Sequence, residues 1–247
     1  MQDRTRSIVL GSVLGLIFLV LLLVVDRLML KPLPEEASTF AHEIDTVFFV
    51  IYYITGAVFA LVTTLLVWFL IRYRAQPGRR ALYTHGSSVL ELTWTMAPAA
   101  VFITLFLLSQ ATWAKVKMFP PPGDVEVRVQ AKQFAWEITY PGPDGKFGTA
   151  DDKTMQGDLH VPVDKVVRVY LRSKDVIHSF FIPTMRLKQD AVPGREIIVW
   201  FQATKAGKYE WPCAELCGPG HSGMKGWVTV HPDDAYQQWV KQQWPSS

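Results

Sequence analysis

The sequence predicts an α+β membrane protein, with two or three N-terminal transmembrane helices followed by an external all-β domain. Long uncharged segments occur only in the first half, and short alternating segments replace them after Pro120. Of the 247 residues, 49% are hydrophobic and only 19% are charged, a balance that favours a membrane protein over a fully soluble one. The net charge of +3 includes no long basic run, so nucleic-acid binding has no support.

Three apolar segments are candidates for membrane spans: residues 8–25, 47–71 and 92–114. A helix needs about 20 apolar residues to cross the hydrocarbon core, which the second and third segments provide. The first also fits a secretory signal, because Arg4 and Arg6 precede it. No small-residue cleavage site follows it, which favours a retained helix.

The loops around these segments predict their orientation. Residues 72–88 contain four arginines and no acid, whereas residues 26–46 contain five acids and two basic residues. The positive-inside rule therefore places residues 72–88 in the cytoplasm. Everything after residue 114 is then expected on the external, periplasmic side of a bacterial-type inner membrane, in a multi-pass protein.

The second half reads as β-structure. Strands are predicted at residues 125–131, 134–140, 166–171, 197–201 and 226–230. Residues 141–145 predict a turn, and the acidic tip ending at Asp151-Asp152 is interpreted as a solvated hairpin rather than a calcium loop, because the ligand spacing of a calcium loop is missing. The predicted organisation is an N-terminal apolar segment with an external loop (1–46), a transmembrane helical hairpin (47–114), a linker (115–123), the β-domain (124–231) and a C-terminal helix (232–247).

Soft metal ligands are concentrated in residues 213–224. Cys213, Cys217, His221 and Met224 lie there, and His178 precedes them by 35 residues. Thiolate, thioether and imidazole together select copper over hard cations. A single blue copper needs only one cysteine, so two bridging thiolates suit two coppers better. Zinc and a disulfide remain as alternatives, although the spacing is not that of a zinc finger and a disulfide leaves the histidines and Met224 unexplained.

The pattern Cys-x-Glu-x-Cys-x3-His-x2-Met resembles that of subunit II of the haem-copper cytochrome c oxidases, and the likeness extends over nearly the whole chain. The resemblance implies a cupredoxin-like Greek-key domain that carries the dinuclear copper A centre. It implies that Cys213 and Cys217 bridge the two coppers, that His178 and His221 each cap one, and that Met224 is a weak axial ligand.

Two glutamates acquire roles from the same resemblance. Glu215 would bind copper through its backbone carbonyl, and its carboxylate would bind a magnesium or manganese ion shared with subunit I. Glu91 is the one ionisable residue near the start of the third apolar segment. It either reaches to the membrane interface or, as the resemblance implies, loads a proton path of subunit I.

The resemblance implies that the chain is an electron-transferring subunit of a proton-translocating oxidase. Electrons would come from cytochrome c or a tethered cytochrome donor and pass through copper A to haem in subunit I, where O2 is reduced to water with proton pumping. The haems would belong to subunit I only, and subunit III would be a further partner. A copper A subunit of a nitric oxide reductase and a copper-free quinol-oxidase subunit II remain as alternatives.

The chain departs from the family pattern at two places. The Gln-Trp-x-Trp motif reads Gln133-Phe134-Ala135-Trp136, and Phe134 with Trp136 is predicted to form the aromatic patch that contacts the donor. Lys174-Asp175 replaces a pair of acids, and the external part holds 17 basic and 15 acidic residues. This balance predicts a donor that is weakly basic, acidic or tethered.

The remaining candidate residues have structural interpretations as well as functional ones. Asp190 either begins a turn before Pro193-Gly194 or, as the resemblance implies, lies near the interface with subunit I. Four histidines lack companion ligands at useful spacing and are interpreted as solvated or structural: His42, His85, His160 and His231.

Overall fold

The computed structural model describes residues 2–29 and 33–245, and the chain divides into two compact units. The helical unit comprises Met1–Leu33 and Thr46–Ser109, and the β-unit comprises Pro34–Asp45 and Gln110–Ser247. The predicted class, membrane helices followed by an all-β cupredoxin-like domain, is confirmed.

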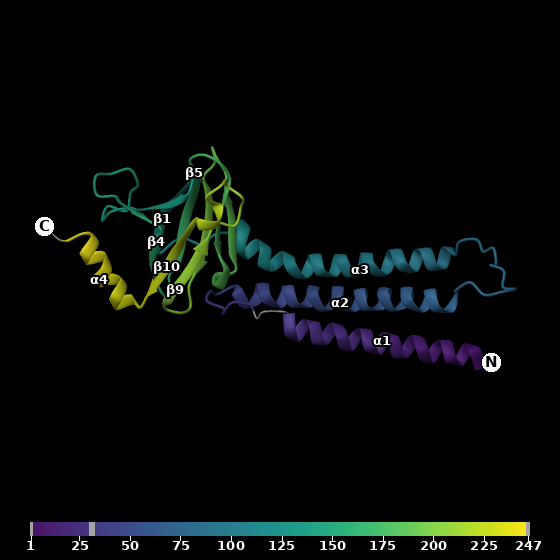
Figure 1. Cartoon of the computed structure of the whole chain (residues 1–247). Coiled ribbons are helices and arrows are strands. Elements are labelled where there is room, and N and C mark those ends of the chain that lie inside the picture. Colours follow the sequence, from purple (N-terminus) through teal and green to yellow (C-terminus); the bar gives the residue numbers. More distant parts are fainter. Residues whose placement is uncertain (1, 30–32, 246–247) are drawn as a thin grey trace. The chain divides into compact units, whose positions relative to one another are not determined.

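Three long helices account for the apolar segments: α1 (Gln2–Met29), α2 (Ala41–Arg72) and α3 (Ser88–Trp113) (Figure 1). The helices at Ala41–Arg72 and Ser88–Met118 are long and apolar enough to cross a membrane, as predicted for the second and third segments. Within α1, a shorter apolar stretch spans Val9–Leu21. Retention of the first helix stays a prediction.

Helices α1 and α2 pack antiparallel through small residues. A Cβ atom at Gly11 would lie 2.5 Å from the Trp68 ring, and one at Gly15 would lie 2.8 Å from Thr64. Further along, the rings of Phe18 and Phe59 are 6.0 Å apart. Small residues let helix backbones approach closely, which is how helices associate where lipid removes the hydrophobic driving force.

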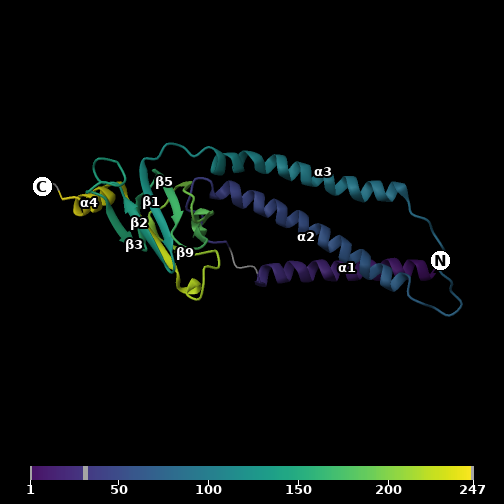
Figure 2. The same cartoon turned by 90° about the horizontal axis from the view of Figure 1, so that it is seen from above.

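The β-unit is built from two main sheets and a hairpin. The larger sheet has the order β3-β2-β1-β5-β8, which Figure 2 shows in part, and the smaller has the order β4-β10-β9. Strands β6 and β7 form the hairpin. The strands are β1 (Val125–Lys132), β2 (Ala135–Tyr140), β3 (Lys153–Gln156), β4 (Asp158–Pro162), β5 (Val166–Ser173), β6 (His178–Ile182), β7 (Leu187–Ala191), β8 (Ile197–Gln202), β9 (Gly207–Pro212) and β10 (Lys225–His231).

The five predicted strands are confirmed as β1, β2, β5, β8 and β10. Their side chains alternate between the core and the outside; in β1, for example, Val127, Val129 and Ala131 are fully buried. Pairs β1–β5 and β4–β10 are parallel, while the other pairs within the sheets are antiparallel. The buried core continues to Cys213, Cys217 and Met224, which are thereby fixed by packing.

The chain segments that precede and follow the membrane-spanning part of α2 and α3 belong to the β-unit and pack on its strands. The Phe40 ring meets the Trp200 ring edge-on at 5.4 Å, and the Trp200 indole N–H donates to the Val116 carbonyl at 3.1 Å. Val116 belongs to a short π-helix, Ala114–Met118, so part of the predicted linker is helical. The Arg186 guanidinium binds both carboxylate oxygens of Asp45, at 2.6 and 2.8 Å.

The acidic tip has the predicted hairpin structure between the paired strands β2 and β3. The Thr149 hydroxyl donates to Asp151 at 2.7 Å, and the Gly148 backbone N–H donates to Asp152 at 2.8 Å. The carboxylates thus complete the turns of the loop. In residues 2–29 and 33–245, the one group of three or more His, Cys, Asp or Glu side chains close enough to hold a metal lies elsewhere.

The C-terminal helix α4 (Asp233–Gln243) lies beside β4 and β10 (Figure 1). The Trp239 ring stacks on His160 at 4.8 Å, and Nδ1 of His160 lies 2.8 Å from Nε2 of His231. The interpretation of His160 and His231 as structural histidines agrees with this packing.

Candidate metal centre

Two parts of the chain supply the predicted ligands. His178 is the first residue of β6 and is fully buried, while the other ligands lie on the loop between β9 and β10. A β-bridge between Phe180 and Cys213 and a hydrogen bond from Ala214 N to the Ser179 carbonyl, 3.1 Å, join the loop to β6. The backbone therefore brings residues 35 positions apart into one cluster.

The two cysteines form the centre of this cluster. Their Sγ atoms are 4.0 Å apart, and both thiols are buried and free. Nδ1 of His178 lies 3.9 Å from Sγ of Cys213, and Nδ1 of His221 lies 3.6 Å from Sγ of Cys217. Each thiol therefore has one imidazole beside it.

Two further donors complete the set. Sδ of Met224 lies 3.8 Å from Sγ of Cys217, and the Glu215 carbonyl oxygen lies 3.4 Å from Sγ of Cys213. Met224 is 1% exposed, so its thioether is held against the thiols by the core. The structure brings together all six residues predicted to bind copper.

This donor set fits copper. Two thiols, two imidazoles and a thioether are soft or borderline ligands, and such a set selects copper or zinc over hard cations. The thioether favours copper, because structural zinc sites use cysteine, histidine and carboxylate ligands. The pair of free thiols does not form a disulfide.

The Cys217 thiol is protonated in the metal-free protein at neutral pH. Burial, together with the neighbouring Cys213, raises the pKa of Cys217 to about 11. A thiol binds metal as the thiolate, so metal binding has to displace this proton.

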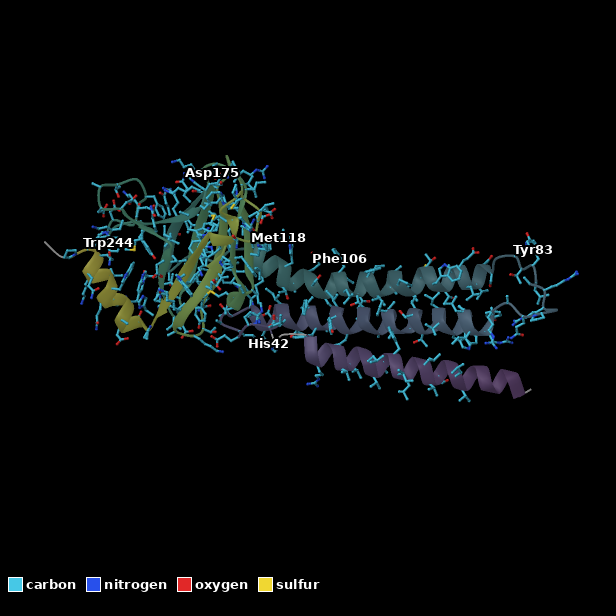
Figure 3. All side chains as sticks on the ribbon, viewed as in Figure 1. His42, Tyr83, Phe106, Met118, Asp175 and Trp244 are labelled. Carbon is cyan, nitrogen blue, oxygen red and sulfur yellow. The ribbon has the colours of Figure 1, made fainter. Side chains whose placement is uncertain are left out.

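Asp175 supports the cluster from outside, as its position at the margin of the β-unit allows (Figure 3). Its Oδ1 lies 2.8 Å from Nε2 of His178, and its Oδ2 accepts from the Gln133 backbone N–H at 2.7 Å. Burial opposes ionisation of Asp175, but the hydrogen bonds from His178 and from backbone N–H groups outweigh it and lower its pKa. This role was not predicted from the sequence, although an acid three residues before a ligand histidine is a usable signal.

The predicted aromatic contact patch needs correction. Trp136 is 1% exposed and packs against Trp211, with ring centroids 4.7 Å apart, so it cannot touch a donor. Strand alternation points Trp136 inward with Ile138, and this overrides the resemblance. Phe134 is 39% exposed and lies over the ligand loop, since a Cβ atom at Gly220 would be 2.5 Å from its ring.

Asp190 does not begin a turn, which corrects one of its two interpretations. It lies within β7 opposite Ser179, and the turn follows at residues 192–195. The Ser179 hydroxyl lowers the pKa of Asp190 against the opposing effect of burial, and the Lys188 ammonium, 3.2 Å from Oδ1, lowers the pKa further. Its carboxylate therefore stays ionised beside the residue that follows His178.

Glu91 is not part of the ligand cluster. It lies in the exposed first turn of α3, in the helical unit. Its carboxylate approaches Gly86, where a Cβ atom would lie 2.6 Å from Oε1.

The fold and site together define a class: a membrane-anchored cupredoxin-like protein with a cysteine, histidine and methionine cluster suited to copper. Residues 24–111 match the family model for the cytochrome c oxidase subunit II transmembrane domain, and residues 131–230 match that for its periplasmic domain.

Known relatives give the same result. The alternative cytochrome c oxidase subunit 2 of Bradyrhizobium diazoefficiens is 30% identical over 222 residues, which cover 81% of this chain and 80% of the relative. Cytochrome c oxidase subunit 2 of Thermostichus vulcanus is 33% identical over 264 residues, 85% of this chain and 78% of the relative. The solved periplasmic domain of subunit II of cytochrome oxidase from Bradyrhizobium japonicum is 32% identical, with a TM-score of 0.45, and the match covers 51% of this chain and 96% of that one. The chain belongs to the cytochrome c oxidase subunit II family, and its role is that of an oxidase subunit.

Proposed function

We propose that the chain receives electrons from an external cytochrome donor and passes them through a dinuclear copper centre to haem in subunit I. There O2 is reduced to water with proton pumping. The observation that carries this proposal is the pair of free thiols 4.0 Å apart, each with an imidazole nitrogen within 4 Å. A single blue copper would need only one thiolate, whereas two bridging thiolates with two capping imidazoles suit a pair of coppers.

Each ligand has a proposed role. Cys213 and Cys217 would bridge the coppers, His178 and His221 would cap them, and Met224 would be the weak axial ligand. Glu215 would contribute its carbonyl oxygen. Copper bound as such a pair supplies a one-electron relay in which two metals share the change in charge.

The protein's part is to hold these donors still. His178 and Met224 are almost fully buried, and the loop is tied to β6 by backbone hydrogen bonds. Nε2 of His178 donates to ionised Asp175, which leaves the Nδ1 lone pair directed at the thiols. Ligands fixed in this way move little when an electron arrives.

We further propose that Glu215 joins this subunit to subunit I. Its carboxylate makes no hydrogen bond or ion pair with any residue that the structure describes, while its carbonyl oxygen faces Cys213. The free carboxylate is suited to a magnesium or manganese ion, because these cations prefer oxygen ligands. Subunit III is a further proposed partner.

Glu91 is proposed to load a proton path of subunit I. An ionisable residue at the start of a membrane helix is costly unless it has a function or reaches the interface. In both interpretations Glu91 lies at the cytoplasmic end of α3. With that orientation the copper domain, residues 124–231, would lie on the periplasmic side.

Two other functions fit less well. A copper-free quinol-oxidase subunit II has no use for the ligand cluster, which is complete here. A nitric oxide reductase subunit would share the cluster, and the position of Glu91 argues mildly against it.

Metal analysis of the full-length protein, purified in detergent and loaded with copper, tests the proposal. We expect two coppers per chain and strong thiolate-to-copper absorption. A single copper, or zinc alone without that absorption, contradicts the proposal.

A further inference from the structure

We propose that Gln133 and Asp175 are positioning residues that link the two ligand segments and arrange them before copper binds. The hydrogen-bonded chain His178–Asp175–Gln133–Cys217 is called the bracket below. The inference rests on the proposed function for the identity of the metal, but the contacts themselves join only residues of this chain.

The bracket is continuous. Oδ1 of Asp175 lies 2.8 Å from Nε2 of His178, and Oδ2 accepts from the Gln133 backbone N–H at 2.7 Å. The side-chain amide of Gln133 then donates to the Cys217 carbonyl at 2.6 Å. Three hydrogen bonds thus connect a capping histidine on β6 to a bridging cysteine on the other ligand segment, without using any metal ligand atom.

The ligand loop is shaped to accept this contact. Gly218 follows Cys217 with φ of +131°, and a Cβ atom there would lie only 2.8 Å from Nε2 of Gln133. Both the backbone angle and the close approach require glycine. The loop therefore meets the Gln133 amide at the residue that presents the Cys217 carbonyl.

Asp175 suits its place because a carboxylate accepts at two oxygens. Besides His178 and Gln133, the Val176 backbone N–H donates to Oδ1 at 2.7 Å. An asparagine has one acceptor oxygen and an NH2 group, so it cannot accept from His178 and from Gln133 at separate oxygens. Asp175→Asn therefore breaks the bracket while keeping the size of the side chain.

The bracket also connects the ligands to the surface. Gln133 directly precedes Phe134, the exposed aromatic residue that lies over Gly220. Fixing Gln133 to Cys217 and Asp175 therefore fixes the base of the Phe134 side chain against the ligand loop.

The test uses full-length Gln133→Met, which keeps the side-chain length but removes the donor, and Asp175→Asn. Gln130→Met is the matched control, because Gln130 lies on β1 beside Arg172 and makes no side-chain hydrogen bond with the described residues. Copper affinity is measured by competition with a chelator, along with the midpoint potential and the thiolate-to-copper absorption. In the metal-free protein, the rate of Cys217 alkylation is measured in a Cys213→Ser background.

We expect Gln133→Met and Asp175→Asn each to weaken copper binding by about 10–100-fold, as loss of supporting hydrogen bonds to metal ligands commonly does. Both variants should also shift the potential and accelerate Cys217 alkylation several-fold. The double variant should lose less than the sum of the single losses in binding free energy, because each change breaks the same bracket. Gln130→Met should match the wild type.

Unchanged affinity, potential and alkylation in both bracket variants would overturn the inference, as would equal changes in Gln130→Met. If Gln133→Met fails to fold, Asp175→Asn decides by the same readouts. Failure of the wild type to bind two coppers counts against the proposed function instead, and the alkylation rates still test the bracket.

Discussion

Sγ of Cys213 and Sγ of Cys217 are 4.0 Å apart in the structure, and neither thiol forms a disulfide. The separation is set by the loop and by packing, since both residues are buried. The cysteines are therefore held in place as a pair, whereas Met224 lies to one side of Cys217 only.

Cys217→Ser should abolish the two-copper absorption, because a hydroxyl cannot replace a bridging thiolate. Met224→Leu should retain both coppers and shift the midpoint potential, because axial ligands tune the metal more than they hold it. Copper analysis and redox titration measure both effects. Met185→Leu is the control, since Met185 is equally buried but lies outside the ligand cluster, and it should change neither. Loss of both coppers in Met224→Leu would contradict the assignment of Met224 as a weak ligand.

The protonated thiol predicts how the metal-free protein responds to pH. With a pKa of about 11, only about one Cys217 thiol in a thousand is ionised at pH 8. Burial, the largest cause of the raised pKa, remains in a Cys213→Ser background, so alkylation of Cys217 there should still rise with pH beyond the range of an ordinary cysteine. Because the pKa in the folded state exceeds 9.0, the value for an unperturbed thiol, the associated stability is present below pH 9 and is lost as the pH rises to about 11. Copper binding near pH 7 should release protons, which calorimetry in buffers of different ionisation enthalpy detects.

The histidine pair under α4 predicts an acid-sensitive contact. Burial lowers the pKa of His160 and of His231, and protonation of both would bring two positive charges together across a 2.8 Å contact. Because their pKa values lie below 6.5, the value for an unperturbed histidine, the stability they confer is present above pH 6.5 and is lost as the pH falls. Acidification should release α4, seen as a change in Trp239 fluorescence or as protease cleavage within the helix. His231→Gln should weaken this pH dependence, and an unchanged profile would refute the mechanism.

Glu91→Gln removes the ionisable proton while keeping the side-chain shape. If the carboxylate loads a proton path, turnover of the assembled oxidase should fall while the rate of copper reduction stays the same. Glu43→Gln is the control, because Glu43 also lies in the first turn of a helix but pairs with Lys115 at 2.6 Å. Equal turnover in Glu91→Gln and the wild type would leave only the interfacial role.

Phe134→Ala should slow copper reduction by an external cytochrome without changing the copper content, because Phe134 is the exposed aromatic residue over the ligand loop. Stopped-flow reduction over a series of salt concentrations measures this, and salt should slow the wild type only mildly. Trp227→Ala, which removes an exposed aromatic residue from β10, is the control. A strongly basic cytochrome whose rate collapses with salt would contradict the predicted class of donor.

The sequence predicts strands well where β-branched residues alternate, as in β1 and β5. Strand β3 escaped prediction because Lys153–Gln156 is polar and mostly exposed at a sheet edge. Strand β6 escaped because four of its five residues are buried, which leaves no alternation to detect.

The ligand set could be predicted because it follows a spacing along the chain. The contacts from Asp175 to His178 and from Gln133 to Cys217 could not, since the second joins residues 84 positions apart. The alternation of Trp136 with Ile138 predicts that Trp136 points inward, whereas the resemblance implies a surface contact.

One contact at the end of the chain bears on how the protein can be handled. The Trp244 indole N–H donates to the Asp151 carbonyl at 2.7 Å, so the end of α4 is bound to the acidic hairpin. A purification tag or fluorescent protein fused directly after Trp244 would disturb both α4 and the acidic hairpin. A flexible spacer placed after Trp244 should preserve this hydrogen bond. It should also preserve the epitope that the hairpin presents to an antibody.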